Sequence, residues 1–238
     1  MRRRKIVMIG VPRDLYYKGI KINALNSIYG TERLIKELSE ITGLKINKYI
    51  VIDMFALAEA INILGGIDVT LEEDLIDPTY KIKENGQWAT LYYKKGSYHL
   101  NGVQALRVAR SRNFTSDFDR ARRQQTVLEA MLEKFKEIGV GSLDKIYELT
   151  RTLITYVDTN LTPFELANYF NRFKDFSIHS RNVLDTENIL YFTWSNLYLL
   201  KDPEKVVDKN FDRGAFILLP VENDWNVIRW YVRELIEG

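Results

Sequence analysis

Six arginines lie in one window of 17 residues that contains no lysine: Arg107, Arg110, Arg112, Arg120, Arg122 and Arg123. An arginine guanidinium is planar, keeps its charge and binds phosphate oxygens in pairs, whereas a lysine ammonium acts as a point charge. A surface that needs only solubility would mix the two residue types. The window therefore predicts an anion site, and a pyrophosphate surrounded by several arginines is its natural ligand.

Two other interpretations of the arginine window stay open. A charged helix is usually a solvated face, and its ion pairs contribute little to stability. The arginines could also bind RNA or DNA phosphates. The formal net charge is only +2, from 34 basic and 32 acidic side chains, and no nucleic-acid-binding module is recognisable. We therefore expect no nucleic-acid partner.

Two predicted helices position these arginines. Helical spacing of apolar residues predicts helices over Leu100–Arg110 and Asp117–Ile138. Arg112 lies just past the first helix, while Arg120 and Arg123 are three residues apart and share one face of the second.

The start of the second helix adds further polar groups. Ser116 is its expected N-cap, and the turn Asn113–Ser116 can fold the two helix ends together. Asp117 can fix arginine side chains in position or accept a proton. The helix N-terminus also supplies free N–H groups and a favourable dipole for an anion.

A separate segment is a candidate contributor to the same site. A short apolar run over Ile6–Ile9 predicts a buried strand, and Arg13-Asp14 follows it after Pro12. Polar groups at strand ends commonly form sites in α/β proteins, so we expect Arg13 to join the anion site.

Alternating strand and helix patterns continue along the chain and predict an α/β fold. The patterns predict strands over 49–52, 67–71 and 216–219, and helices over 31–41, 54–64, 143–157, 163–173 and 225–236. Between residues 72 and 97 the sequence predicts a long loop or a strand pair joined at Asn85-Gly86. We expect a single domain over 1–238, with a motif-bearing core of about 5–138 that residues 139–238 complete.

Composition narrows the chemistry. The chain has no cysteine, which excludes disulfides, thiolate metal sites and a cysteine nucleophile. No stretch is apolar for the roughly 20 residues that span a bilayer, and we recognise no export signal. With 46% hydrophobic residues, the 238-residue chain can bury a sizeable core.

Several short motifs occur in a fixed order along the first half of the chain. They are Val11–Tyr16 (VPRDLY), Lys21–Ala24 (KINA), Tyr49–Asp53 (YIVID), Leu64–Val69 (LGGIDV), His99–Gly102 (HLNG), Gln104–Leu106 (QAL), Ala109–Arg112 (ARSR), Ser116–Arg120 (SDFDR) and Arg123–Gln125 (RQQ). Their order and spacing over about residues 5 to 138 resemble the LytR-CpsA-Psr family.

The resemblance implies a fold, an activity and a location. The fold is a three-layer α/β/α arrangement with a central mixed β-sheet and an apolar pocket for a polyprenyl chain. The activity is that of a phosphotransferase that moves an anionic glycan, such as teichoic acid or capsule, from a polyprenyl-pyrophosphate carrier to peptidoglycan. The location is the extracytoplasmic face of a bacterial cell membrane.

The resemblance also implies roles for individual residues. It makes the following arginines the pyrophosphate ligands: Arg13, Arg110, Arg112, Arg120 and Arg123. It assigns catalysis to Arg112, Asp117 and Arg120. Of these, Asp117 orients the arginines and is a candidate general base. Its supporting residues are Asp14, Lys21, Asn23 and Gln124.

The sequence departs from the family pattern at two places. Family members carry, ahead of the PRD strand, a transmembrane helix and a strand-loop segment whose acidic residues bind Mg²⁺, whereas this sequence begins almost at the PRD strand. We therefore expect either an internal start, with membrane association through the missing anchor, or a reduced homologue. The reduced homologue would be a non-catalytic module that binds polyprenyl phosphate or glycan. The family's glycine after Asp-Phe is Asp119 here.

Two weaker candidates come from outside the arginine window. The acidic residues Glu72, Glu73, Asp74 and Asp77 could serve as substitute Mg²⁺ ligands, but such a run is more often a solvated strand end. His99 could transfer protons, although its position before Leu-Asn-Gly indicates support of a helix start.

Overall fold

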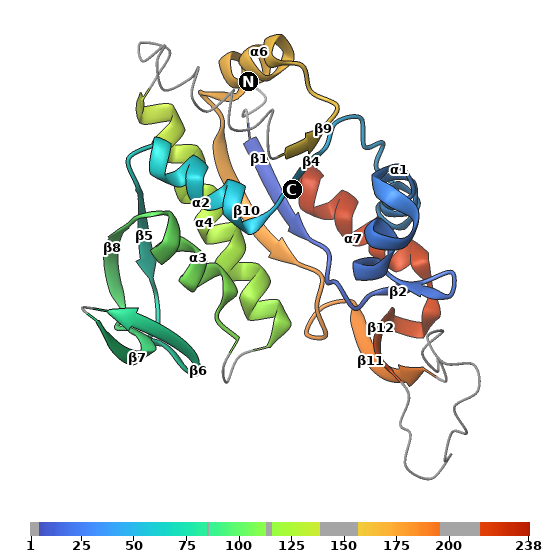
Figure 1. Cartoon of the computed structure of the whole chain (residues 1–238). Helices are drawn as coiled ribbons and strands as arrows, with labels where there is room; N and C mark the ends of the chain where they lie inside the picture. Colours follow the sequence, from blue (N-terminus) through green and yellow to red (C-terminus); the bar gives the residue numbers. More distant parts are fainter. Residues whose placement is uncertain (1–4, 85, 113–115, 139–156, 196–214) are drawn as a thin grey trace. The chain divides into compact units, whose positions relative to one another are not determined.

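The structure is a computed structural model that describes residues 5–84, 86–112, 116–138, 157–195 and 215–238 (Figure 1). Contacts divide the chain into two compact units. The first unit contains the described residues within Met1–Met8 and Asn47–Arg181. The second unit contains the described residues within Ile9–Ile46 and Asn182–Gly238. The predicted α/β class is confirmed. That residues 1–238 form a single domain stays a prediction.

The first unit contains most of the predicted elements. Its helices are α2 (Met54–Ile63), α3 (Gly102–Arg110), α4 (Asp117–Ile138) and α6 (Pro163–Phe173). Its strands are β4 (Ile50–Ile52), β5 (Ile67–Leu71), β6 (Leu75–Glu84), β7 (Gln87–Tyr93), β8 (Gly96–Leu100) and β9 (Val157–Thr159). In the described residues these strands pair antiparallel, β4 with β9, β5 with β8 and β6 with β7.

The core of the first unit follows from the sequence pattern. Strand β5 alternates buried and exposed residues, so Ile67, Val69 and Leu71 point into the core. The helices α2, α3 and α4 pack in succession beside these strands. A Cβ at Gly102 would lie 2.1 Å from the carbonyl oxygen of Ala58, so only glycine permits this close approach of α3 to α2.

The segment between β5 and β8 is the predicted strand pair. Strands β6 and β7 form an antiparallel hairpin, and Gly86 in its turn has a φ of 83°. The register of the hairpin shifts between Asp77 and Lys81, so three residues of β6 bulge out of the ladder. This bulge gives Asp77 the geometry described below.

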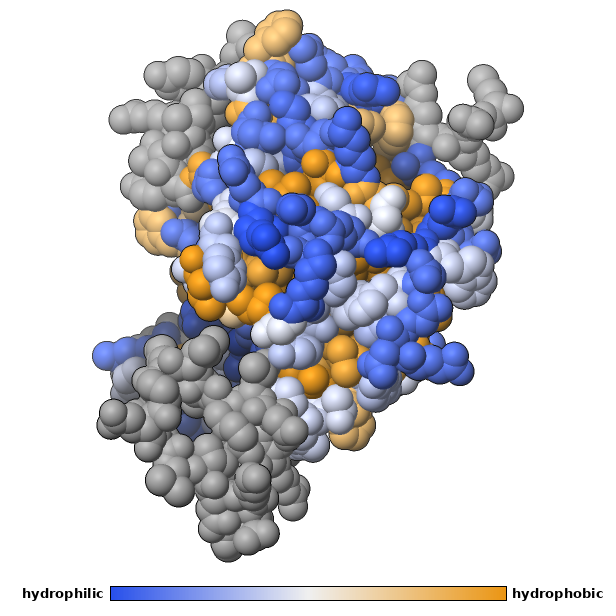
Figure 2. All heavy atoms as spheres, turned by 90° about the vertical axis from the view of Figure 1, so that its right-hand side faces the viewer, coloured by the Kyte–Doolittle hydropathy of each residue, from blue (hydrophilic) through white to orange (hydrophobic). Residues whose placement is uncertain are grey.

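The second unit contains helices α1 (Ile22–Thr42) and α7 (Trp225–Glu237), the short helix η1 (Val221–Asn223) and strands β2 (Tyr16–Tyr17), β3 (Ile20–Lys21), β11 (Leu190–Ser195) and β12 (Ala215–Pro220). Strand β11 pairs antiparallel with β12. The face that carries α1 mixes hydrophilic and hydrophobic side chains, as Figure 2 shows, and Ile28 and Tyr29 of α1 are exposed.

The helix predicted over 31–41 is the second half of a longer helix. The helix α1 begins at Ile22 and is kinked at Gly30, where φ is 80° and ψ is 173°. The predicted start at Thr31 therefore coincides with this break, and only the turns over 22–29 were not predicted. The helix ends as predicted, because Gly43 adopts the left-handed conformation that closes a helix.

Strands β1 (Lys5–Gly10) and β10 (Ser177–Val183) pair with each other, and the division between the units falls within both. The pattern did not predict β10 or β11. Most of the helix predicted over 143–157 lies outside the described residues, and Val157 begins β9 instead. Within the described part of the chain, no helix is long and apolar enough to span a membrane.

Candidate functional site

The predicted N-cap of α4 is present. The Ser116 hydroxyl accepts a hydrogen bond from the Asp119 backbone N–H at 3.1 Å, and the Ser116 backbone N–H donates to the Asp119 carboxylate at 2.8 Å. These reciprocal bonds form a capping box. Burial alone would raise the pKa of Asp119, but the bonds from Ser116 and the ion pair with Arg122 hold it below its usual value. Asp119 therefore fixes both the helix start and Arg122.

Arg120 lies against Asp117, as the sequence analysis expected. One guanidinium nitrogen of Arg120 is 3.0 Å from the Asp117 carboxylate, and the Arg120 side chain is only 12% exposed. The Asp117 carboxylate is more accessible, at 42%. The pair holds a largely buried guanidinium in one orientation and leaves the carboxylate open to solvent or to a ligand.

Arg123 joins α4 to the end of α3. Its guanidinium donates to the carbonyl oxygen of Ser111 at 2.7 Å, and the side-chain amide of Gln124 donates to the carbonyl oxygen of Ala109 at 3.5 Å. Burial lowers the pKa of Arg123, although the nearby carboxylates Asp119 and Asp77 oppose the effect. An arginine remains charged at neutral pH, so a positive charge is kept partly buried at this helix junction.

Asp77 organises the turn after α3, a role that the sequence analysis missed. Its side chain is buried, with 2% exposure. One carboxylate oxygen accepts bonds from the Thr79 N–H, the Thr79 hydroxyl and the Tyr80 N–H inside the bulge, at 3.1, 2.7 and 3.0 Å. The other accepts from the Ser111 hydroxyl at 3.1 Å and the Arg112 N–H at 2.9 Å. Asp77 therefore ties the hairpin to the backbone that carries Arg112.

The side chains of Arg110 and Arg112 are exposed at the end of α3, beside the turn that Asp77 fixes. The tip of the predicted turn, 113–115, lies outside the described residues. The structure thus brings the end of α3 and the first turns of α4 together. That these arginines bind pyrophosphate stays a prediction.

The other predicted site residues form a cluster of their own in the second unit. The Lys21 ammonium donates to the Asp14 carboxylate at 2.8 Å, and the Arg13 guanidinium lies 4.0 Å from the same carboxylate. The Asn23 backbone N–H donates to the Arg13 carbonyl oxygen at 3.0 Å. Asp14 thus orients both cations. The convergence of this group with the arginines of the first unit stays a prediction.

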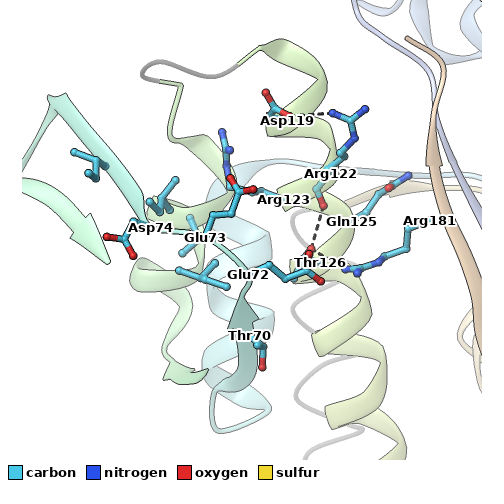
Figure 3. Close-up of a pocket in the computed structure, with 14 residues that line it drawn as sticks. Thr70, Glu72, Glu73, Asp74, Asp119, Arg122, Arg123, Gln125, Thr126 and Arg181 are labelled. Carbon is cyan, nitrogen blue, oxygen red and sulfur yellow. Dashed lines mark hydrogen bonds and ion pairs between the residues drawn. The ribbon is translucent and has the colours of Figure 1, made fainter. Parts of the chain in front are cut away.

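A cavity of about 690 Å³ opens beside Arg123 (Figure 3). Its walls come from the segment between β5 and β6, from α3 and α4, and from Arg181 of β10. Arg181 donates to the Thr126 hydroxyl at 2.8 Å and lies 3.0 Å from the Glu129 carboxylate. The wall that faces the acidic segment is therefore held in place.

The described residues do not form a protein-only magnesium site. No group of three or more acidic, histidine or cysteine residues is arranged to hold a metal in the part of the chain that the structure describes. Asp77 is occupied by five hydrogen bonds, and Asp74 accepts from the Lys95 N–H and the Tyr92 hydroxyl. Binding of Mg²⁺, and any role of the acidic run in it, stays a prediction to which we assign no step.

His99 supports a turn instead of the helix start. Its Nδ1 lies 2.7 Å from the Asp68 carboxylate across the β5–β8 ladder, and its Nε2 lies 2.9 Å from the Gly65 carbonyl oxygen. The Asp68 bond raises the pKa of His99, and the Gly65 bond adds to the effect. The helix start itself is capped by Asn101, which exchanges hydrogen bonds with Gln104.

A sequence profile of the LytR_cpsA_psr family matches residues 1–209. The chain belongs to the LytR-CpsA-Psr family. It is 27% identical over 222 residues to the polyisoprenyl-teichoic acid–peptidoglycan teichoic acid transferase TagV of Bacillus subtilis (strain 168), covering 87% of this chain and 54% of TagV. It is 31% identical over 166 residues to the regulatory protein MsrR of Staphylococcus aureus (strain COL), covering 66% of this chain and 47% of MsrR.

Solved structures of relatives share the fold of this LytR-CpsA-Psr chain. The crystal structure of Bacillus subtilis TagV matches with a TM-score of 0.68 and 26% identity, covering 98% of this chain and 84% of that one. The match confirms the predicted LytR-CpsA-Psr fold, while the central mixed sheet and the apolar pocket for a polyprenyl chain stay predictions. The chain spans about half the length of the curated relatives it matches.

Proposed function

We propose that this LytR-CpsA-Psr chain is a phosphotransferase that attaches an anionic glycan from a polyprenyl-pyrophosphate carrier to peptidoglycan at the extracytoplasmic face of the membrane. The observation that carries the proposal is the junction of α3 and α4, where Asp77 holds the backbone of Arg112 and neighbouring groups hold the guanidiniums of Arg120 and Arg123. Membership of the family and likeness to a teichoic acid transferase support the same reaction.

The proposed reaction is a substitution at phosphorus. A hydroxyl oxygen of the acceptor sugar bonds to the phosphorus that carries the glycan, while the bond from that phosphorus to the bridging oxygen breaks. The products are glycan joined through a phosphodiester and polyprenyl phosphate. The accessible Asp117 carboxylate accepts the hydroxyl proton, and the arginines stabilise the negative charge that develops on the leaving phosphate.

The anchored arginines suit this task because they need little rearrangement when charge develops. Arg120 is held by Asp117 and Arg123 by the Ser111 carbonyl oxygen, so both guanidiniums are oriented before substrate arrives. Preorganised donors of this kind are typically the largest contribution to catalysis of group transfer. The proposal also assigns Arg13 to binding of the diphosphate, with Asp14 and Lys21 as supporting residues.

The test is transfer from a lipid-linked glycan donor to peptidoglycan, followed by release of polyprenyl phosphate. We expect the double variant Arg112→Ala, Arg120→Ala to lose at least a hundredfold in rate, the scale of removing one preorganised donor. The matched control is Arg172→Ala, Arg233→Ala, which removes two exposed arginines outside the site. Undiminished transfer in the first variant would refute the assignment. Retention of polyprenyl diphosphate without any transfer would favour a binding module instead.

A further inference from the structure

The cavity beside Arg123 is lined by both carboxylates and guanidiniums, whereas arginines predominate in the cluster at the junction of α3 and α4. Its lining includes the carboxylates of Glu72, Glu73 and Asp74 on the segment between β5 and β6. Arg122 and Arg181 line the same cavity, and Figure 3 shows the Glu72 side chain pointing toward Thr126 and Arg181. Because carboxylates accept hydrogen bonds and guanidiniums donate them, the lining suits a ligand that both donates and accepts.

Three classes of ligand fit this lining poorly. A polyanion such as teichoic acid would meet the carboxylates at short range, and like charges repel. A polyprenyl chain would have to remove water from charged groups of both signs without offering them hydrogen bonds, which is costly. A simple cation would meet Arg122 and Arg181. A neutral polyhydroxylated ligand avoids all three penalties.

The cavity also has a volume that such a ligand can occupy. Its volume of about 690 Å³ falls within the range of small-molecule sites, roughly 300 to 1,000 Å³. Leu71 and Leu75, which are 7% and 5% exposed, give the cavity a small apolar part that can contact the C–H face of a sugar ring. The polar walls are preformed, since Asp119 holds Arg122 at 2.9 Å and Thr126 holds Arg181 at 2.8 Å.

The cavity and the arginine cluster share Arg123. We infer that this cavity binds the uncharged sugar backbone of the acceptor and presents a hydroxyl to the diphosphate held by the neighbouring arginines. This inference rests on the proposed function and assigns its acceptor site. The acceptor enters from the acidic segment, and the donor stays on the basic side of Arg123, so the two substrates meet at one residue.

The experiment is a titration of the ¹⁵N-labelled full chain with chitotetraose, a neutral β-1,4-linked N-acetylglucosamine oligomer. We expect saturable shifts of the backbone amides over 70–76. The double variant Glu72→Ala, Glu73→Ala removes two exposed carboxylates and should weaken binding about tenfold, the effect of losing hydrogen bonds to charged groups worth about 1.4 kcal/mol. The control Glu133→Ala, an exposed glutamate on α4 outside the lining, should leave the affinity unchanged.

A parallel titration with geranyl diphosphate separates this inference from the proposed function. We expect the Glu72→Ala, Glu73→Ala variant to bind the diphosphate as well as the original chain does, because the carboxylates do not attract it. Absence of chitotetraose binding, shifts confined to other amides, or equal affinity in the two glutamate variants and the original chain would overturn the acceptor site. Failure of the original chain to bind geranyl diphosphate would overturn the proposed function instead.

Discussion

Replacement of Asp77 by alanine should cost far more stability than the loss of an ordinary surface carboxylate. The change removes the acceptor of five hydrogen bonds, among them those of the fully buried Ser111 hydroxyl and the Arg112 N–H. Each buried donor left without a partner costs about 1 to 3 kcal/mol. Water can reach the donors of the exposed Thr79. We therefore count only the Ser111 hydroxyl and the Arg112 N–H, and expect a loss of about 2 to 6 kcal/mol.

The assay is the free energy of unfolding from urea titration of the full chain. The matched control is Asp53→Ala, which removes an exposed N-cap carboxylate with one bond, to the Ala56 N–H at 2.7 Å, and should cost about 1 kcal/mol. The isosteric Asp77→Asn variant keeps one acceptor and should fall between the two. Equal losses in Asp77→Ala and Asp53→Ala would refute the view that Asp77 fixes the turn of Arg112.

The Asp77→Asn variant also tests the link from stability to function. If this carboxylate positions the turn, the folded variant should bind geranyl diphosphate more weakly, because one of the two oxygens that join the hairpin to the Arg112 backbone becomes an N–H donor. Any variant that leaves the Arg112 N–H without an acceptor should keep an affinity for geranyl diphosphate below that of the original chain. Unchanged affinity in a correctly folded Asp77→Asn protein would limit Asp77 to a purely structural role.

Two further predictions concern the first unit. The pKa of His99, measured by NMR titration, should lie above 6.5 and return toward 6.5 in Asp68→Asn. The stabilisation that the His99–Asp68 pair contributes should be fully present below about pH 6.5 and be lost as the pH rises through the folded-state pKa. An unchanged His99 pKa in the variant would contradict this account. Gly102→Ala should lower the free energy of unfolding by at least about 1 to 3 kcal/mol, because its Cβ would meet the Ala58 carbonyl oxygen at 2.1 Å. The control Gly86→Ala meets no atom within 4 Å and tests backbone strain alone. A smaller loss at Gly102 than at Gly86 would contradict the packing argument.

Local signals predicted much of the fold. The capping box at Ser116, the left-handed Gly43 and the turn at Gly86 are each determined by residues a few positions apart, and the elements that they bound are confirmed. The helical turns of α1 before Gly30 were missed because the prediction began the helix at Thr31, directly after this glycine. Strand β10 was missed because its polar residues, exemplified by Arg181, interrupt the apolar run expected of a buried strand.

The candidate site was predictable only in part. The ion pair of Arg120 with Asp117 follows from spacing along one helix, and the structure contains it. The bond from Asp77 to the Arg112 N–H joins residues 35 positions apart through a bulge, and no local pattern encodes such a contact. The role of Arg123 depends likewise on where α4 crosses the end of α3.

The most direct test of the central claim is whether a diphosphate binds at the junction of α3 and α4. Titration of the ¹⁵N-labelled chain with geranyl diphosphate should shift the side-chain Nε–H signals of Arg120 and Arg123 and the backbone amide of Arg112, in a saturable manner. Geraniol, which lacks the diphosphate, should leave these signals unchanged. Saturable binding that shifts other arginines but not these three residues, or no saturable binding at all, would contradict the account.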